Sequence, residues 1–146
     1  MKNILLLLTF FVTSFAFAQA PPPPSMPTND NKVLIDELIK VTEFENYFTE
    51  YCKNKVEQAA KESNWEDGKT QQIIESIKFK YFSNSIYNAF AVDSKENLSK
   101  TIILFKSMNE NRKDSILKMI PINAMIQFNL DGFAKSIIEG KYIINK

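Results

Sequence analysis

Histidine is absent from this 146-residue sequence, and cysteine occurs once, at Cys52. Without histidine the chain has no Ser-His-Asp triad and no zinc-binding H-E-x-x-H helix. One cysteine without histidine also excludes a cysteine protease and a zinc knuckle. We therefore expect a protein that is not an enzyme and that uses no metal or cofactor.

An excess of charge of one sign is also missing. The sequence has 18 Lys and Arg residues and 17 Asp and Glu residues, and Arg112 is its only arginine. Nucleic acids and anionic membranes select basic surfaces, and bidentate phosphate recognition prefers arginine. Neither nucleic acid nor a membrane surface is therefore a predicted partner.

The start of the chain is typical of an export signal. Lys2 is positive, residues 4–12 are apolar, and Ala16-Phe17-Ala18 is a small-x-small cleavage site before Gln19. The apolar run is shorter than the about 20 residues that a transmembrane helix needs. The sequence predicts a protein without a transmembrane anchor, located in the periplasm or secreted.

A proline-rich segment, Ala20 to Pro27, follows the predicted cleavage site. Such a run adopts extended polyproline helix and acts as a spacer. The remaining length fits one domain. We expect a signal peptide at residues 1–18, a disordered Pro-rich linker at 19–31 and one all-α domain at 32–146.

From Asn31 onward apolar residues recur at helical spacing, and no stretch alternates as a strand does. The pattern predicts an all-α bundle of five or six helices. A first helix should bend near Thr42, where Thr42 and Glu45 have the spacing of a capping box. The second helix should run to Glu62 and be followed by a loop over residues 63–68.

The spacing next predicts a long central helix over residues 69–90. Its apolar residues lie on two nearly opposite faces, so different neighbours should cover its two ends. One face carries Ile73, Ile74, Ile77 and Tyr81, and the other carries Phe79, Phe82, Ile86 and Phe90.

Asp93 and Glu96 repeat the capping-box spacing and should open a helix that ends near Ser107. Ile103 and Leu104 flank its apolar stripe. Pro121 should start or kink a later helix, and Gly140 should end the last one. The residues expected to fold back onto the core after it are Tyr142, Ile143 and Ile144.

Two patterns suggest hydrolytic chemistry and form the last alternative for function. Ser115 and Lys118 have the S-x-x-K spacing of penicillin-recognising enzymes, but the S-D-N and K-T-G motifs are missing. Asp114-Ser115-Ile116 also resembles an O-glycosylation sequon. The neighbouring carboxylates Glu66 and Asp67 would act as acid and base only if they were buried, and a polar loop favours exposure.

Four residues are predicted contacts for a partner or ligand: Cys52, Trp65, Phe82 and Phe90. Cys52 lies in an apolar helical stripe, where it is a buried small residue or, in an oxidising compartment, the link of a covalent dimer. Trp65 covers the core or offers an aromatic platform. Phe82 and Phe90 belong to twelve phenylalanines that pack a core or line a lipid-like ligand's pocket.

The order of features resembles that of an exported bacterial family, domain of unknown function 2059. The shared features are a signal peptide, the segment Leu38-Ile39-Lys40-Val41-Thr42, a tryptophan loop before a long helix, and residues 96–107 with Phe105 before a helix reaching Pro121. The chain departs from the family at residues 107–110, where a Ser-Pro-x-Gly turn is usual. The resemblance implies an all-α exported domain and no catalytic residues.

These observations together predict an exported, non-enzymatic helical protein. The main hypothesis is an interaction or accessory module of the cell envelope, which predicts an exposed apolar patch and a closed core. The alternative is a carrier of an apolar or lipid-like small molecule, which predicts an apolar pocket between helices. The partner is accordingly an envelope protein or an apolar ligand, and the state is monomer or homodimer.

Overall fold

The computed structural model describes residues 26–112 and 118–143, and all regular secondary structure within these ranges is helical. This confirms the all-α prediction. The elements are α2 (Asn29–Val41), α3 (Phe44–Glu62), α4 (Asp67–Glu75), the 3₁₀ turn η1 (Phe79–Tyr81), α5 (Ser83–Ala89), α6 (Lys95–Glu110) and α7 (Ala124–Ile138). The signal peptide, most of the linker, Ser115 and Ile144 lie outside the described residues.

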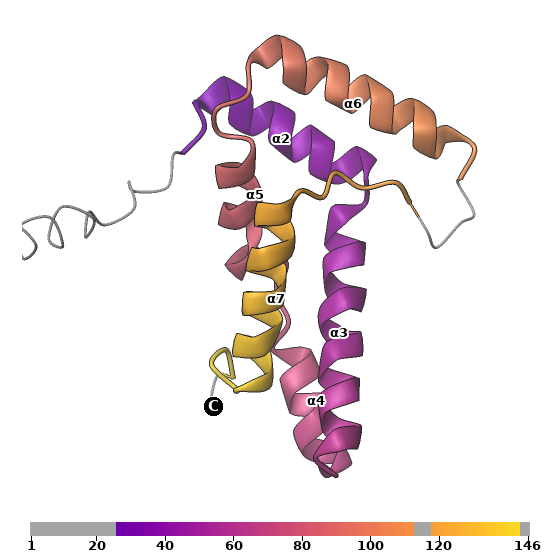
Figure 1. Cartoon of the computed structure of the whole chain (residues 1–146), viewed down its shortest axis with the longest axis vertical. Coiled ribbons are helices and arrows are strands. Elements are labelled where there is room, and N and C mark those ends of the chain that lie inside the picture. Colours follow the sequence, from indigo (N-terminus) through magenta and orange to yellow (C-terminus); the bar gives the residue numbers. More distant parts are fainter. Residues whose placement is uncertain (1–25, 113–117, 144–146) are drawn as a thin grey trace, which may run out of the picture.

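The helices form two regions, which we call the bar and the stem (Figure 1). The bar consists of α2 and α6, and the stem of α3, α4, η1, α5 and α7. The two bar helices run parallel, because their first turns are joined to each other. Asn31 donates a hydrogen bond to the carbonyl of Asp93 at 2.8 Å, and Lys95 pairs with Asp30 at 3.3 Å.

The turn between bar and stem is built by Thr42 and Glu43. The Thr42 side chain is fully buried, and its hydroxyl donates back to the Leu38 carbonyl at 2.7 Å. Glu43 has a φ of 51°, in the left-handed region, and immediately precedes α3. The predicted capping box at Thr42 is therefore wrong, because this hydroxyl ends α2 instead of starting α3.

Aromatic rings fill the core of the stem. Phe48 of α3 is fully buried, and its ring centroid lies between 5.2 and 5.4 Å from three other phenylalanine centroids. The three partners are Phe79, Phe82 and Phe133. Rings at this separation gain attraction beyond the burial of their area, so this cluster ties η1 and α7 to α3.

The predicted helix over residues 69–90 is wrong, because the chain breaks there into α4, η1 and α5. Ser76 ends α4, and Lys78 is extended with φ −133° and ψ 120°. A straight helix would turn one of its two apolar faces away from the core. The break lets Phe79 and Phe82 both reach Phe48.

Helix boundaries near α2 and α6 also differ from the expected ones. Thr28 caps α2, which begins at Asn29, three residues before the predicted start of the domain. Ser94 caps α6 by accepting from the backbone N–H of Asn97 at 3.1 Å, so the predicted capping box one residue earlier is wrong. The helix ends at Glu110 instead of near Ser107.

The last helix ends as predicted, but Pro121 does not start or kink it. Pro121 lies in the non-helical segment before α7, and Asn123 caps that helix. Gly140 has a φ of 77°, a conformation that favours glycine. Its N–H bonds to the Ile137 carbonyl and that of Lys141 to the Ser136 carbonyl, which is a Schellman motif. Tyr142 and Ile143 then pack on the core, as expected.

Candidate functional site

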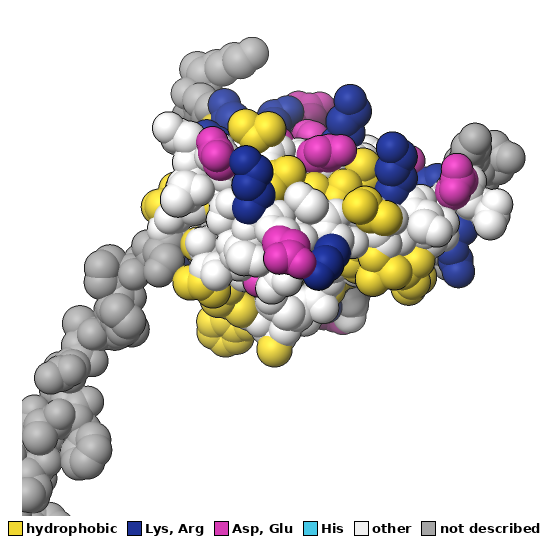
Figure 2. All heavy atoms as spheres, turned by 90° about the horizontal axis from the view of Figure 1, so that it is seen from above, with side chains coloured by type: hydrophobic (Ala, Val, Ile, Leu, Met, Phe, Trp, Pro, Cys, Tyr) yellow, Lys and Arg dark blue, Asp and Glu magenta, His cyan; other side chains and the backbone are white. Residues whose placement is uncertain are grey.

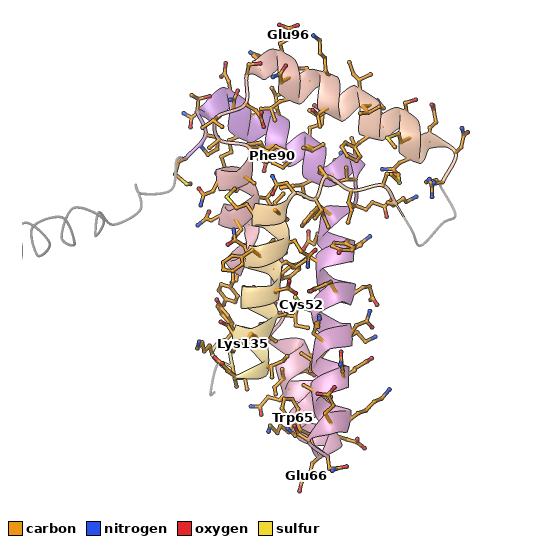
Figure 3. All side chains as sticks on the ribbon, viewed as in Figure 1. Cys52, Trp65, Glu66, Phe90, Glu96 and Lys135 are labelled. Carbon is orange, nitrogen blue, oxygen red and sulfur yellow. The ribbon has the colours of Figure 1, made fainter. Side chains whose placement is uncertain are left out.

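The four residues predicted as contacts are not brought together in one site. Cys52 and Phe82 are buried, at 0% and 1% exposure, whereas Trp65 and Phe90 are half-buried against the core. Figure 3 shows Phe90 beside the bar, Cys52 midway along the stem and Trp65 near its free end. The structure therefore gives no common ligand contact for these side chains.

Cys52 is enclosed by the stem. Burial raises the pKa of its thiol to about 12, because a thiolate would lack solvation there. The thiolate is the form that forms disulfides. The interpretation of Cys52 as a buried apolar residue is confirmed, and a covalent dimer through this sulfur would require the stem to open.

Trp65 closes the free end of the stem. The Lys69 ammonium lies 3.9 Å from the centroid of its ring, and the indole packs against the core. A surface pocket of about 340 Å³ adjoins the indole. Glu66 and Asp67 beside it are both exposed, so they lack the burial that the carboxylate hypothesis requires.

Lys118 of the S-x-x-K pattern lies near the bar. Its side chain is 10% exposed and pairs with Glu43 at 3.5 Å, and its ammonium also donates to the Arg112 carbonyl. Ser115 lies outside the described residues, so the serine and lysine pair stays a prediction.

Exposed apolar side chains occur on α6, on α7 and on the segment that leads into α7, and we refer to these residues together as the α6–α7 apolar surface. Its most exposed members are Phe128 at 78% and Ile103 at 67%. Its members are Ile103, Leu104, Met108, Met119, Ile122, Met125 and Phe128. Figure 2 shows hydrophobic side chains in several groups on the surface, one of them beside the end of the molecule where α6 finishes. Contiguous exposed apolar patches are typical of interaction sites.

Asn109 ties the last turn of α6 to the segment that leads into α7. Its side chain is buried, accepts from the Met119 N–H at 2.7 Å and donates to the Met119 carbonyl at 2.9 Å. The same amide group donates to the Val41 carbonyl at 3.5 Å, at the end of α2. These bonds fix the backbone at Met119, in the segment that leads into α7, to the last turn of α6.

A second pocket lies between α4, η1 and the turn after α7, and we call it the Tyr81–Tyr142 pocket. Its volume is about 400 Å³. Its lining is Gln72, Glu75, Ser76, Lys78, Lys80, Tyr81, Tyr142 and Ile143. The sequence interpretation missed this pocket, because the break after Glu75 that forms it lies inside the predicted long helix. The change of apolar face near Tyr81 was the one available signal.

A polar cluster joins α3 and α7 on the outside of the stem. The Tyr51 hydroxyl donates to Asp131, and Gln127 donates to Asp131 at 3.2 Å. Burial, followed by the bond to Asp131, raises the pKa of Tyr51 to about 12. The bonds from Tyr51 and Gln127 lower the pKa of Asp131. The cluster stabilises helix packing and has no pocket beside it among those that the structure shows.

Within residues 26–112 and 118–143, no group of three acidic or cysteine side chains could hold a metal ion. No helix in these ranges is long and apolar enough to cross a membrane. Comparison with protein-family models, curated proteins and solved structures finds no match for the chain. The resemblance to domain of unknown function 2059 therefore stays a prediction.

Proposed function

We propose that this protein is an exported, non-enzymatic interaction module that binds another protein of the cell envelope through the α6–α7 apolar surface. The observation that carries the proposal is the exposure of Ile103, Leu104 and Phe128, each more than half exposed. Covering large apolar side chains that a folded domain leaves in water lowers the free energy, so these side chains favour the binding of a partner. The export signal places this encounter in the periplasm or outside the cell.

The surface is already formed in the isolated chain, which favours binding. The first turn of α6 is held by the bonds from Asn31 and Lys95, and its last turn by Asn109. A partner therefore does not have to order this helix, and little affinity is lost to conformational entropy. The aromatic ring of Phe128 and the methionines nearby are side chains typical of interface centres.

The carrier alternative has less support. It predicts a pocket with an apolar lining, whereas the Trp65 and Tyr81–Tyr142 pockets are lined largely by charged and polar side chains. The phenylalanines of the stem contact each other instead, around Phe48. These contacts favour core packing as the role of the buried rings.

Site-specific photo-crosslinking in the native organism tests the proposal. A benzoylphenylalanine replaces Leu104 in one strain and Phe128 in a second, and the exposed Asn54 of α3 in a control strain. We expect the same protein to be crosslinked from positions 104 and 128 and not from 54. A crosslink to a second copy from both positions would identify a homodimer.

The variant Leu104→Asp tests whether a change on the same surface weakens the binding of the partner. A carboxylate at the centre of an apolar contact has to be desolvated on binding, so the crosslink from position 128 should fall about tenfold or more. Lys106→Gln on the same helix is the control. Equal crosslinks from all three positions, or none from positions 104 and 128, would overturn the proposal.

A further inference from the structure

We propose that the Tyr81–Tyr142 pocket binds a sugar acid, that is, a small ring carrying several hydroxyl groups and one carboxylate. This site is separate from the α6–α7 apolar surface and does not depend on it. Its volume of about 400 Å³ lies in the range of small-molecule sites, about 300 to 1,000 Å³.

The aromatic wall of the pocket is rigid because it is anchored in the core. The ring centroid of Tyr142 lies 5.2 Å from that of Tyr81 and 4.9 Å from that of Phe133. Phe133 in turn packs on Phe48. The Schellman motif at Gly140 turns the chain so that Tyr142 reaches this position. A wall of this kind is preformed, so a ligand does not have to order it.

Two lysines give the pocket its selectivity for an anion. Lys78 and Lys80 both line it, and no ion pair among the described residues uses either ammonium. The Lys80 ammonium lies 5.1 Å from the centroid of the Tyr81 ring, so the ring holds this charge at the wall. Both lysines give the lining positive charge, so a carboxylate on a ligand there would receive charge-assisted hydrogen bonds.

The remaining polar groups of the lining favour a ligand that carries hydroxyls. Glu75 offers only acceptor oxygens when ionised, and Gln71 donates to one of them at 3.0 Å. Its other oxygen suits a hydroxyl donor and repels a second anionic group. The Gln72 amide both donates and accepts. A fatty acid offers Gln72 and Glu75, which are both exposed, no hydrogen bonds beyond those of water, whereas a sugar acid pairs with the lysines through its carboxylate and with Glu75 through its hydroxyls.

Isothermal titration calorimetry of the purified chain with galacturonate, galactose and acetate tests the ligand class. We expect galacturonate to bind about tenfold or more tightly than galactose, because only the acid pairs with the lysines. Acetate should bind as weakly as galactose, since it lacks the hydroxyls. Trigalacturonate distinguishes the source: equal affinity indicates a free sugar acid, and tighter binding indicates an acidic glycan chain.

The double variant Lys78→Gln/Lys80→Gln assigns the site. Both changes are on the surface, so the fold should be retained, and the affinity for galacturonate should fall to that for galactose. Lys106→Gln on the bar is the matched control and should leave binding unchanged. Failure of galacturonate to bind, or binding that the double variant leaves intact, would overturn the inference.

Discussion

The bar and the stem bury their apolar side chains in different ways. In the stem, helices surround an aromatic centre at Phe48, whose ring meets three other phenylalanines. In the bar, α6 packs chiefly against α2, with Leu98 and Ile102 facing inward. The opposite side of α6 has no cover, and Ile103 and Leu104 stay in water.

Polar contacts at the two ends of α6 add to its packing on α2. Asn31 and Lys95 hold its start, and Asn109 holds its end. A helix fixed at its ends and covered on one side is suited to present its free side to a partner. The comparison predicts that the stem depends mainly on ring packing, whereas the bar depends on aliphatic packing between α2 and α6 together with a few hydrogen bonds at their ends.

The largest expected effect is that of Phe48→Ala. Removing a buried phenylalanine costs about 3–5 kcal/mol through lost transfer energy and the cavity left behind. Urea unfolding followed by circular dichroism measures the change, and Cys52 labelling should accelerate because the stem opens more often. Phe128→Ala, at an exposed position, should change stability by less than about 0.5 kcal/mol. Similar losses for the two variants would contradict the aromatic-core account.

Asn109→Ala should have the next largest effect on stability, and it should destabilise the bar without destabilising the stem. It leaves the Met119 N–H and carbonyl without their partner, which costs about 1–3 kcal/mol. Hydrogen exchange at the Met119 amide should accelerate, while Trp65 fluorescence stays unchanged. The exposed Asn97 on the same helix supplies the control, as Asn97→Ala. A shift of Trp65 fluorescence in Asn109→Ala would mean that bar and stem are not separable.

Ser94→Ala should have a smaller effect at the other end of α6. The variant loses the acceptor for the Asn97 N–H, and loss of such a cap costs about 1 kcal/mol. Exchange of amides in the first turn of α6 measures the result. Ser107→Ala, exposed near the end of the helix, should leave those amides protected. Equal exchange rates of these amides in the two variants would show that the Ser94 cap does not stabilise the first turn of α6.

Disrupting the polar cluster that joins α3 and α7 should change stability least, and the size of this change should depend on pH. Because the pKa of Asp131 is lowered on folding, its contribution is present above the ordinary pKa of 3.8 and is lost as the pH falls through the folded value. Because the pKa of Tyr51 is raised from 10.0 to about 12, stability also falls as the pH rises over that interval.

Thermal unfolding between pH 3 and 12 separates these two changes. The stability difference between the wild type and Tyr51→Phe should be largest between about pH 4 and 10 and should decline on both sides. Asp131→Asn should remove the acid decline and keep the alkaline one, since burial still raises the pKa of Tyr51. A constant difference across the range would show that the bond contributes nothing.

The sequence predicted the parts of the fold that depend on local patterns. The helical class, the end of α3 at Glu62, the stop at Gly140 and the burial of Cys52 each follow from spacing or from one residue's conformational preference. The break between α4 and η1 was missed because it depends on Phe48, a residue far away in the sequence that attracts both Phe79 and Phe82.

The candidate sites were less predictable than the fold. Periodicity placed Ile103 and Leu104 beside the apolar stripe of α6, but whether a neighbouring helix covers them depends on tertiary packing. The Tyr81–Tyr142 pocket depends on the same break that was missed, and on a turn that brings Tyr142 back to α4. Phe82 was chosen from the sequence as a ligand contact, but it lies in the core. A pattern of phenylalanines does not distinguish core packing from ligand contact.

The parallel arrangement of α2 and α6 has a consequence for the order of folding. Asn31 and Asp93 meet across a separation of 62 positions in the chain, so the contacts of the bar have high contact order. Closing so long a loop is entropically unfavourable until the intervening segment is compact. We expect the bar to assemble after the stem, with the folding transition state insensitive to Leu98→Ala and sensitive to Phe48→Ala. Until then α2 packs only against α3 and α5 of the stem, and it lacks its main neighbour, α6, which lies more than sixty residues later in the chain.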